Sequence, residues 1–307
     1  QNHDRKRVRR RAYENVSGVD KGEVRISIMA TETNAYALGN VSSKDINTIK
    51  HIPSQIQADT LFTFSTKLSY IIPSIKEMIL SPRYCVEDIG YLKIKNLKKI
   101  AYPMKCFCDI NLHRIQEHLH WYGYYGLAFS KAWGMRNCIQ PVHYINPESE
   151  LRRDFTTAFS AALKAKTDNE SSVQIKMKNY LLHQLMYFKP YDGKIQNRVT
   201  GKLKRKCFTD ECEWRFVPDV SKVEFEQILF DNSVYDIGLL TDLSNSMSGI
   251  QKISLSFDYS DLKYIIVKTM DDFQELATVI AGLKLDKLKE QQLFSKIIIW
   301  DISKGDF

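Results

Sequence analysis

The 307-residue sequence predicts a single α+β domain with a mixed, largely antiparallel sheet and a helical middle segment. Three observations predict this class. Segments with period-two alternation come first, helical periodicity follows between residues 149 and 187, and short apolar strands return near the end. Hydrophobic residues at 44% and charged residues at 26% exclude a wholly disordered or fibrous chain.

The first half of the chain divides into a basic arm and the start of the domain. Residues 1–57 lack apolar periodicity, so we expect a weakly structured arm there and the domain over 58–307. Asp59–Ser65 alternates as a strand does, and Lys67–Leu80 has helical spacing, with Pro73 favouring a kink or a late start after Ser69. Further strands are predicted at Met104–Asp109, Trp121–Phe129 and Gln140–Ile145.

The second half is predicted to begin with two helices and to end with two strands. The turn signals Asp192-Gly193 and Thr200-Gly201 indicate a β-hairpin around the basic stretch 194–206. The helices are predicted at Ser149–Ala165, Ser172–Tyr187 and Asp271–Leu283, and the strands at Glu213–Val217, Tyr264–Lys268 and Ile297–Asp301.

The net charge of +8 comes from two short stretches. Residues 1–11 carry six cations and Asp4, which gives +6 − 1 = +5, and Lys194–Lys206 carries six cations and no acid, which gives +6. A basic tail of this kind is typical of a solvated arm, and the alternative is non-specific contact with nucleic acid. The residues predicted to carry such contact are Arg5, Lys6, Arg7, Arg9, Arg10, Arg11, Lys202, Lys204, Arg205 and Lys206.

The cysteines and the apolar runs indicate a soluble cytoplasmic protein. Six cysteines in a chain of this length do not form a small disulfide framework, and the basic N-terminal stretch has no signal-peptide character. The longest apolar runs, such as Ile297–Trp300, are too short to cross a bilayer. Cys106 and Cys108 share one face of a strand and could join Cys207 and Cys212 around zinc. These spacings match zinc motifs poorly and favour small buried hydrophobic roles, so no metal is predicted.

No phosphate-binding loop, dinucleotide fingerprint, zinc-protease motif or nucleophile elbow occurs, and unusual residues concentrate in three places instead. The first, Tyr102–His120, contains Asp109 and His118. The second, Trp121–Trp133, is an aromatic run interrupted by glycines, which indicate either close approach of a backbone or ligand, or an aromatic core strand with bulges.

The third place is Asp210–Pro218, where a strand would put Glu211, Glu213 and Arg215 on one face. Either Glu213 and Arg215 form an exposed ion pair, or a carboxylate points into a cleft for acid–base work. In the second case, a pocket is expected where Arg83, Asp109, Tyr122 and Glu213 converge, and replacing Glu213 by Gln should leave the fold intact.

Several blocks together resemble the AbiGi family of bacterial abortive-infection, phage-resistance proteins. The blocks are FTFST at 62–66, SPRYCVED at 81–88, PMKCFCDINL at 103–112, residues 118–129 with KAWG at 131–134, PVHYI at 141–145 and EWRF at 213–216. They keep their order over about residues 60–220. The resemblance implies an antitoxin or regulator paired with a nucleotidyltransferase-type toxin, with no cofactor and no membrane partner.

Some blocks also resemble ADP-ribosyltransferase-like folds, which implies a NAD-using effector as the alternative function. Under that alternative Glu213, Arg83 and Tyr122 are catalytic, with Glu213 orienting the ribose and Arg83 and Tyr84 lying toward the nucleotide. Tyr122 and Tyr125 would stack on the nicotinamide. The remaining pocket residues would be Tyr84, Asp109, His118, Tyr125, Glu211 and Arg215, and whether the chain is an enzyme stays open.

Overall fold

An eight-stranded sheet forms the centre of the computed structural model, which describes residues 52–306 except 56, 165–171 and 231. The strand order is β14-β13-β5-β1-β4-β11-β6, and β3 pairs with the first half of the long strand β4. All neighbours in this sheet are antiparallel except β13 and β14. The strands are β1 (Thr60–Ser65), β3 (Arg83–Asp88), β4 (Lys99–Cys108), β5 (Tyr125–Ser130), β6 (Gln140–Pro141), β11 (Glu213–Phe216), β13 (Leu262–Val267) and β14 (Ile297–Ile299).

Three small two-stranded sheets lie beside the central one. The pairs are β2 (Ile79–Leu80) with β12 (Leu255–Ser256), β7 (His143–Ile145) with β8 (Phe188–Pro190), and β9 (Asp192–Gln196) with β10 (Leu203–Cys207). The last pair is the hairpin that the turn signals predict.

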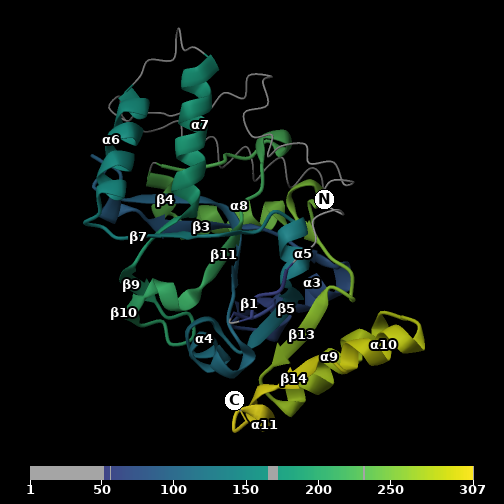
Figure 1. Ribbon diagram of the computed structural model, residues 1–307. Helices are drawn as coiled ribbons and strands as arrows, with labels where there is room; N and C mark the ends of the chain where they lie inside the picture. The colour runs from purple at the N-terminus through teal and green to yellow at the C-terminus, as the bar shows by residue number, and fades with distance from the viewer. Residues whose placement is uncertain (1–51, 56, 165–171, 231, 307) are drawn as a thin grey trace.

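Helices pack on both faces of the central sheet (Figure 1). One face carries α4 (Ile115–Tyr122), α6 (Glu150–Lys164) and α7 (Ser172–Tyr187). The other face carries α3 (Ile72–Glu77), α5 (Lys131–Arg136), α8 (Ile237–Met247), α9 (Met270–Gly282) and α10 (Lys287–Phe294), and the short α11 (Trp300–Ser303) follows β14.

The register of the strands decides which side chains share a face. Glu213 lies opposite Cys108, and Cys108 lies opposite Phe62, so all three project toward α4. Trp214 lies opposite Phe107 and packs into the core on the other face. The predicted placement of Cys106 and Cys108 on one face of the strand is therefore confirmed, and Phe107 lies on the other face.

Most of the predicted elements are present, with shifted ends. The helix predicted over residues 67–80 begins only at Ile72, with Pro73 in its first turn, and Met78 ends it in a left-handed conformation. The first strand, the two middle helices, the hairpin, and the strand and helix at 262–282 lie close to their predicted positions. The closing strand is shorter, because a helical turn begins at Trp300.

One predicted strand is wrong at its start. Trp121 and Tyr122 form the last turn of α4, and the strand begins at Tyr125. The helix is favoured because Ile115 and Leu119, four residues apart, are both buried against the sheet. Strand β3 and helix α8 were not predicted. The basic stretch at 5–11 lies outside the described residues, so the arm stays a prediction. Among the residues described, no helix has the length and apolar character needed to cross a bilayer.

Candidate functional site

Six charged side chains gather on the α4 side of β11, and we call them the buried charge cluster. Three carboxylates face three cations there, and the ion pairs connect them into one network. The members are Glu87 on β3, Lys189 on β8, Lys206 on β10, Glu211 in the turn Phe208–Glu211, and Glu213 and Arg215 on β11.

The Arg215 guanidinium occupies the innermost position and is fully buried. Its Nε donates to Glu213 Oε1 at 2.7 Å, and its Nη2 lies 3.0 Å from Glu87 Oε2. Its Nη1 donates to the Tyr102 hydroxyl at 2.6 Å and to the Met186 carbonyl at 2.9 Å. Each guanidinium nitrogen therefore has a partner, as a buried charge requires.

Glu211 forms the second centre of the cluster. Lys189 Nζ lies 2.5 Å from Glu211 Oε2 and also pairs with Glu213, so this one ammonium bridges the two carboxylates. Lys206 Nζ lies 3.1 Å from Glu211 Oε1, and the Tyr122 hydroxyl donates to the same oxygen. Cys212, in a left-handed conformation, ends the turn, and β11 begins at the next residue, Glu213.

Electrostatics hold Glu211 and Glu213 in their ionised form. Burial alone would raise the pKa of Glu213, but the Arg215 and Lys189 cations outweigh it and hold that pKa well below its usual range. The pKa of Glu211 is lowered against burial by Lys189, and burial together with Glu211 raises the pKa of Tyr122. At neutral pH the carboxylates stay charged and the phenol stays a donor. None of these three groups is poised for proton transfer.

His118 lies beside the cluster on α4. Its side chain is 5% exposed, packs between the rings of Phe64 and Tyr122, and its Nε2 has no hydrogen-bond partner among the described residues. Burial, with help from the Lys206 charge, lowers the pKa of His118 to about 4. The imidazole is therefore neutral at physiological pH.

Some of the predicted pocket residues contact one another in the buried charge cluster, and others do not. Tyr122, Glu211, Glu213 and Arg215 meet in the cluster, although the expected exposed pair of Glu213 and Arg215 is buried.

Four other predicted residues do not join the cluster. Asp109 pairs with buried Lys131 at 2.7 Å. Exposed Arg83 donates to Asn245, and Tyr84 packs in the core beneath α8. Tyr125 lies on the opposite sheet face, where its hydroxyl lies 3.1 Å from Asp272 Oδ1. The Arg83 and Asp109 side chains thus do not converge with Glu213, although the Asp109 amide donates to the Cys212 carbonyl at 3.0 Å.

Three cluster members were not predicted in this role. Lys189 and Glu87 come from other elements, and Lys206 appeared only as part of the basic stretch. One signal for Lys189 is present in the sequence, because it is the single charge in the otherwise apolar run 185–190. The described residues contain no group of three or more His, Cys, Asp or Glu side chains arranged to hold a metal.

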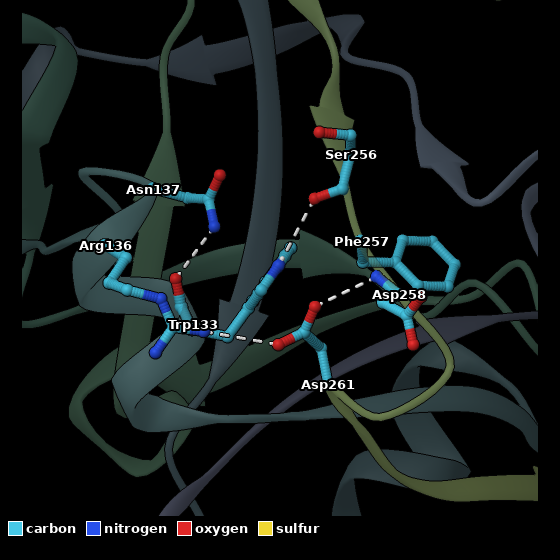
Figure 2. A pocket seen from close by; sticks show the side chains of 7 residues that line it. All are labelled: Trp133, Arg136, Asn137, Ser256, Phe257, Asp258 and Asp261. Atoms are coloured by element: carbon cyan, nitrogen blue, oxygen red, sulfur yellow. Dashed lines mark hydrogen bonds and ion pairs between the residues drawn. The ribbon is translucent and has the colours of Figure 1, made fainter. Parts of the chain in front are cut away.

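Two open depressions lie away from the cluster. The first, of about 420 Å³, lies between α5 and the segment after β12 (Figure 2). Its polar groups satisfy one another: Arg136 pairs with Asp261 at 3.2 Å, and Asp261 accepts from the Asp258 amide at 2.9 Å. The second, of about 430 Å³, lies between α3 and α9 near Lys76. No cluster residue lines either one.

Comparison with known proteins places the cluster inside a recognised region. Residues 77–268, which contain all six members, match the family described as "abortive phage resistance protein AbiGi, antitoxin". The chain is also 30% identical over 259 residues to the "Abortive phage resistance protein AbiGi" of Lactococcus lactis subsp. cremoris, covering 75% of this chain and all of that protein. No solved structure matches the chain. This chain belongs to the AbiGi family of abortive phage resistance proteins.

Proposed function

We propose that this chain is the antitoxin or regulator of an abortive-infection pair and acts by binding, without a reaction of its own. Its partner would be a nucleotidyltransferase-type toxin. The antitoxin label of the matching family supports this function. The buried charge cluster supports one part of it, the absence of a reaction that uses Glu213.

The state of Glu213 is the observation that carries the proposal. A carboxylate that orients a ribose must face an open site, with at least one oxygen free for the substrate. Here the side chain of Glu213 is 6% exposed, and its two oxygens are engaged by Arg215 and Lys189. Each charge is matched by an opposite one, as in a structural ion-pair network.

The alternative of a NAD-using effector receives less support from the geometry. It requires Tyr122 and Tyr125 on the same nicotinamide ring, but the two tyrosines lie on different sides of the sheet. It also requires Arg83 near Glu213, whereas Arg83 contacts Asn245. These placements favour a binding protein.

The pairing predicts a nucleotidyltransferase-type gene beside this one, and growth measurements with that gene test the proposal. The predicted toxin gene is induced alone, with this gene, or with this gene carrying an early stop codon. We expect growth arrest in the first and third cultures and recovery in the second. Arrest in all three cultures would contradict the proposal.

A second measurement addresses the enzymatic alternative. The purified full chain is incubated with NAD, and nicotinamide release is followed by chromatography. We expect no release above the heat-denatured control. Release by the native chain, together with toxicity of this gene expressed by itself, would favour the effector instead.

A further inference from the structure

Helix α7 carries apolar side chains on two opposite faces. One face is buried, and Leu181 and Leu185 pack there in the core shared with α6 and β4. The other face carries Val173, Met177 and Tyr180, whose exposed fractions are 69%, 54% and 57%. A helix on the surface of a globular domain usually has one apolar face toward the core and a polar face toward solvent. The second apolar face of α7 is therefore not explained by the core.

The three exposed side chains form one row, which we call the α7 stripe. Positions 173, 177 and 180 are four and three residues apart, so their side chains project from the same side of the helix. At 1.5 Å of rise per residue, the row extends for about 10 Å. This spacing is the one by which a helix docks into an apolar groove of a partner protein.

Helix α6, which packs beside α7, has the usual pattern (Figure 1). Phe155 and Phe159 are buried in the same core, whereas Arg153 and Asp154 are exposed. The exposed Leu151 stands alone in the first turn of α6. Single exposed apolar residues are normal on a protein surface, but a contiguous apolar patch indicates an interaction site.

The charges of α7 indicate the chemistry of the partner. The helix contains Lys176 and Lys178 and no acidic residue. Lys176 lies three residues after Val173 and four before Tyr180, so it borders the α7 stripe, and it is exposed with no acidic partner among the residues described. A cation at the edge of an apolar row favours a groove with an apolar centre and an acidic rim. Phosphate is bound by cations instead of Val and Met side chains, so the stripe favours a protein over a nucleic acid.

The basic β9–β10 hairpin does not present a comparable surface. Lys206 turns inward to the buried charge cluster, and Arg205 pairs with Asp192. Lys202 and Lys204 are exposed but lie on the same side of the ribbon as Lys206, opposite to Arg205. The cations are thus divided between the two faces.

We infer that the α7 stripe is the surface through which this chain binds its toxin, and that the toxin presents an apolar groove with an acidic rim. The inference rests on the proposed function, which requires a protein partner. Met177 suits this role because a thioether side chain adapts to the shape of a groove. Tyr180 suits it because tyrosine is one of the side chains that most often dominate the affinity of an interface.

The test measures, by isothermal titration calorimetry, how the purified full chain binds the purified product of the predicted toxin gene. The stripe variant carries Val173→Ala, Met177→Ala and Tyr180→Ala. Alanine has the highest helix propensity, so α7 should stay folded, and circular dichroism checks this. A second variant, Lys176→Glu, tests the acidic rim.

The matched control removes three similarly exposed apolar side chains from other helices. It carries Ile237→Ala in α8, Leu288→Ala in α10 and Ile302→Ala in α11. Both triple variants are also expressed with the toxin in the growth measurements described above.

We expect the stripe variant to bind the toxin about 30-fold more weakly or worse, because a few central side chains carry most of the affinity of an interface. It should also fail to restore growth. The control should bind the toxin and restore growth like the original chain. Lys176→Glu should weaken binding more at about 50 mM than at about 300 mM NaCl, because salt screens charges at a rim.

The results that overturn the inference differ from those that overturn the proposed function. Toxin binding and growth that the stripe variant retains would contradict the inference alone. Equal losses in the stripe variant and the control, or unchanged binding by Lys176→Glu at low salt, would contradict it too. A stripe variant that binds the toxin normally but no longer self-associates in sedimentation would assign the stripe to a second copy of this chain. An original chain that neither binds the toxin nor restores growth would overturn the proposed function, and the inference with it.

Discussion

Glu213 and Arg215 lie two residues apart on β11, so any extended conformation places them on the same face. Sequence alone could therefore predict their proximity. It could not predict their burial, because the other partners come from distant elements: Lys189 from β8 and Glu87 from β3. Contacts between residues so far apart in the sequence depend on the order of the strands in the sheet. No local sequence pattern encodes that order.

The pH dependence of stability provides a test at the scale of one residue. The pKa of His118 is lowered from 6.5 to about 4 in the folded chain, so between these values the unfolded chain binds a proton that the folded chain does not. His118 therefore contributes stability that is present above about pH 6.5 and is lost as the pH falls toward 4. From pH 6.5 to 5 the loss should be about 2 kcal/mol.

Urea unfolding at pH 7, 6 and 5 measures this loss. The charged groups that act on His118 are Lys206, Glu211 and Asp210. We expect His118→Gln to flatten the stability profile in this window, whereas His113→Gln, at an exposed position, should keep the original slope. Parallel profiles for the original chain and His118→Gln would show that His118 does not titrate as described.

At the scale of elements, the aromatic block 121–129 shows what a local pattern can predict. Its glycines indicated either close approach of a backbone or ligand, or bulges in a core strand. The structure confirms close backbone approach at Gly123, where a Cβ atom would lie 2.0 Å from the Ser65 carbonyl oxygen. The first two residues of the block, Trp121 and Tyr122, were predicted as strand but belong to α4. The packing of α4 against the sheet outweighs their strand propensity.

Replacing Gly123 tests this junction between α4 and β5. An alanine there would clash with the backbone of Ser65 and Thr66, and it would also have to adopt a φ of +111°. We expect Gly123→Ala to lower the free energy of unfolding by about 3 kcal/mol, from steric overlap and backbone strain together. Urea unfolding measures this loss of free energy. Gly282→Ala serves as the control, because a Cβ atom there meets nothing within 4 Å. Equal midpoints for the two variants would contradict this view of the junction.

At the scale of the whole molecule, the sheet joins segments from both ends of the described chain. β13 and β14 pair beside β5, while β11 lies between β4 and β6. The α+β class and the mixed, mostly antiparallel sheet were predictable from the succession of periodicities. The strand order was not predictable, because hydrophobic alternation identifies a strand without naming its neighbours.

This interleaving predicts that residues 58–307 unfold as one unit. Limited trypsin digestion followed by mass spectrometry should remove residues before 58 and leave a core of about 28 kDa, at roughly 0.11 kDa per residue. Separating one half of the sheet from the other would expose the buried apolar residues that pack against both halves. Accumulation of two stable fragments of similar size would contradict a single domain.

The most direct test of the account measures the stability of Glu213→Gln by urea unfolding at pH 7. Gln preserves the shape of the side chain but leaves Arg215 and Lys189 buried with one anion fewer. Breaking a buried pair in this way typically costs about 3 to 5 kcal/mol. Because Glu213 is buried and paired, we expect a loss in that range, in place of the unchanged fold that the sequence predicts. Glu148→Gln, at an exposed ion pair with Lys93, is the matched control and should leave the urea midpoint unchanged. A Glu213→Gln variant as stable as the original chain would contradict a structural role for the buried charge cluster and would return Glu213 to candidacy as a catalytic residue.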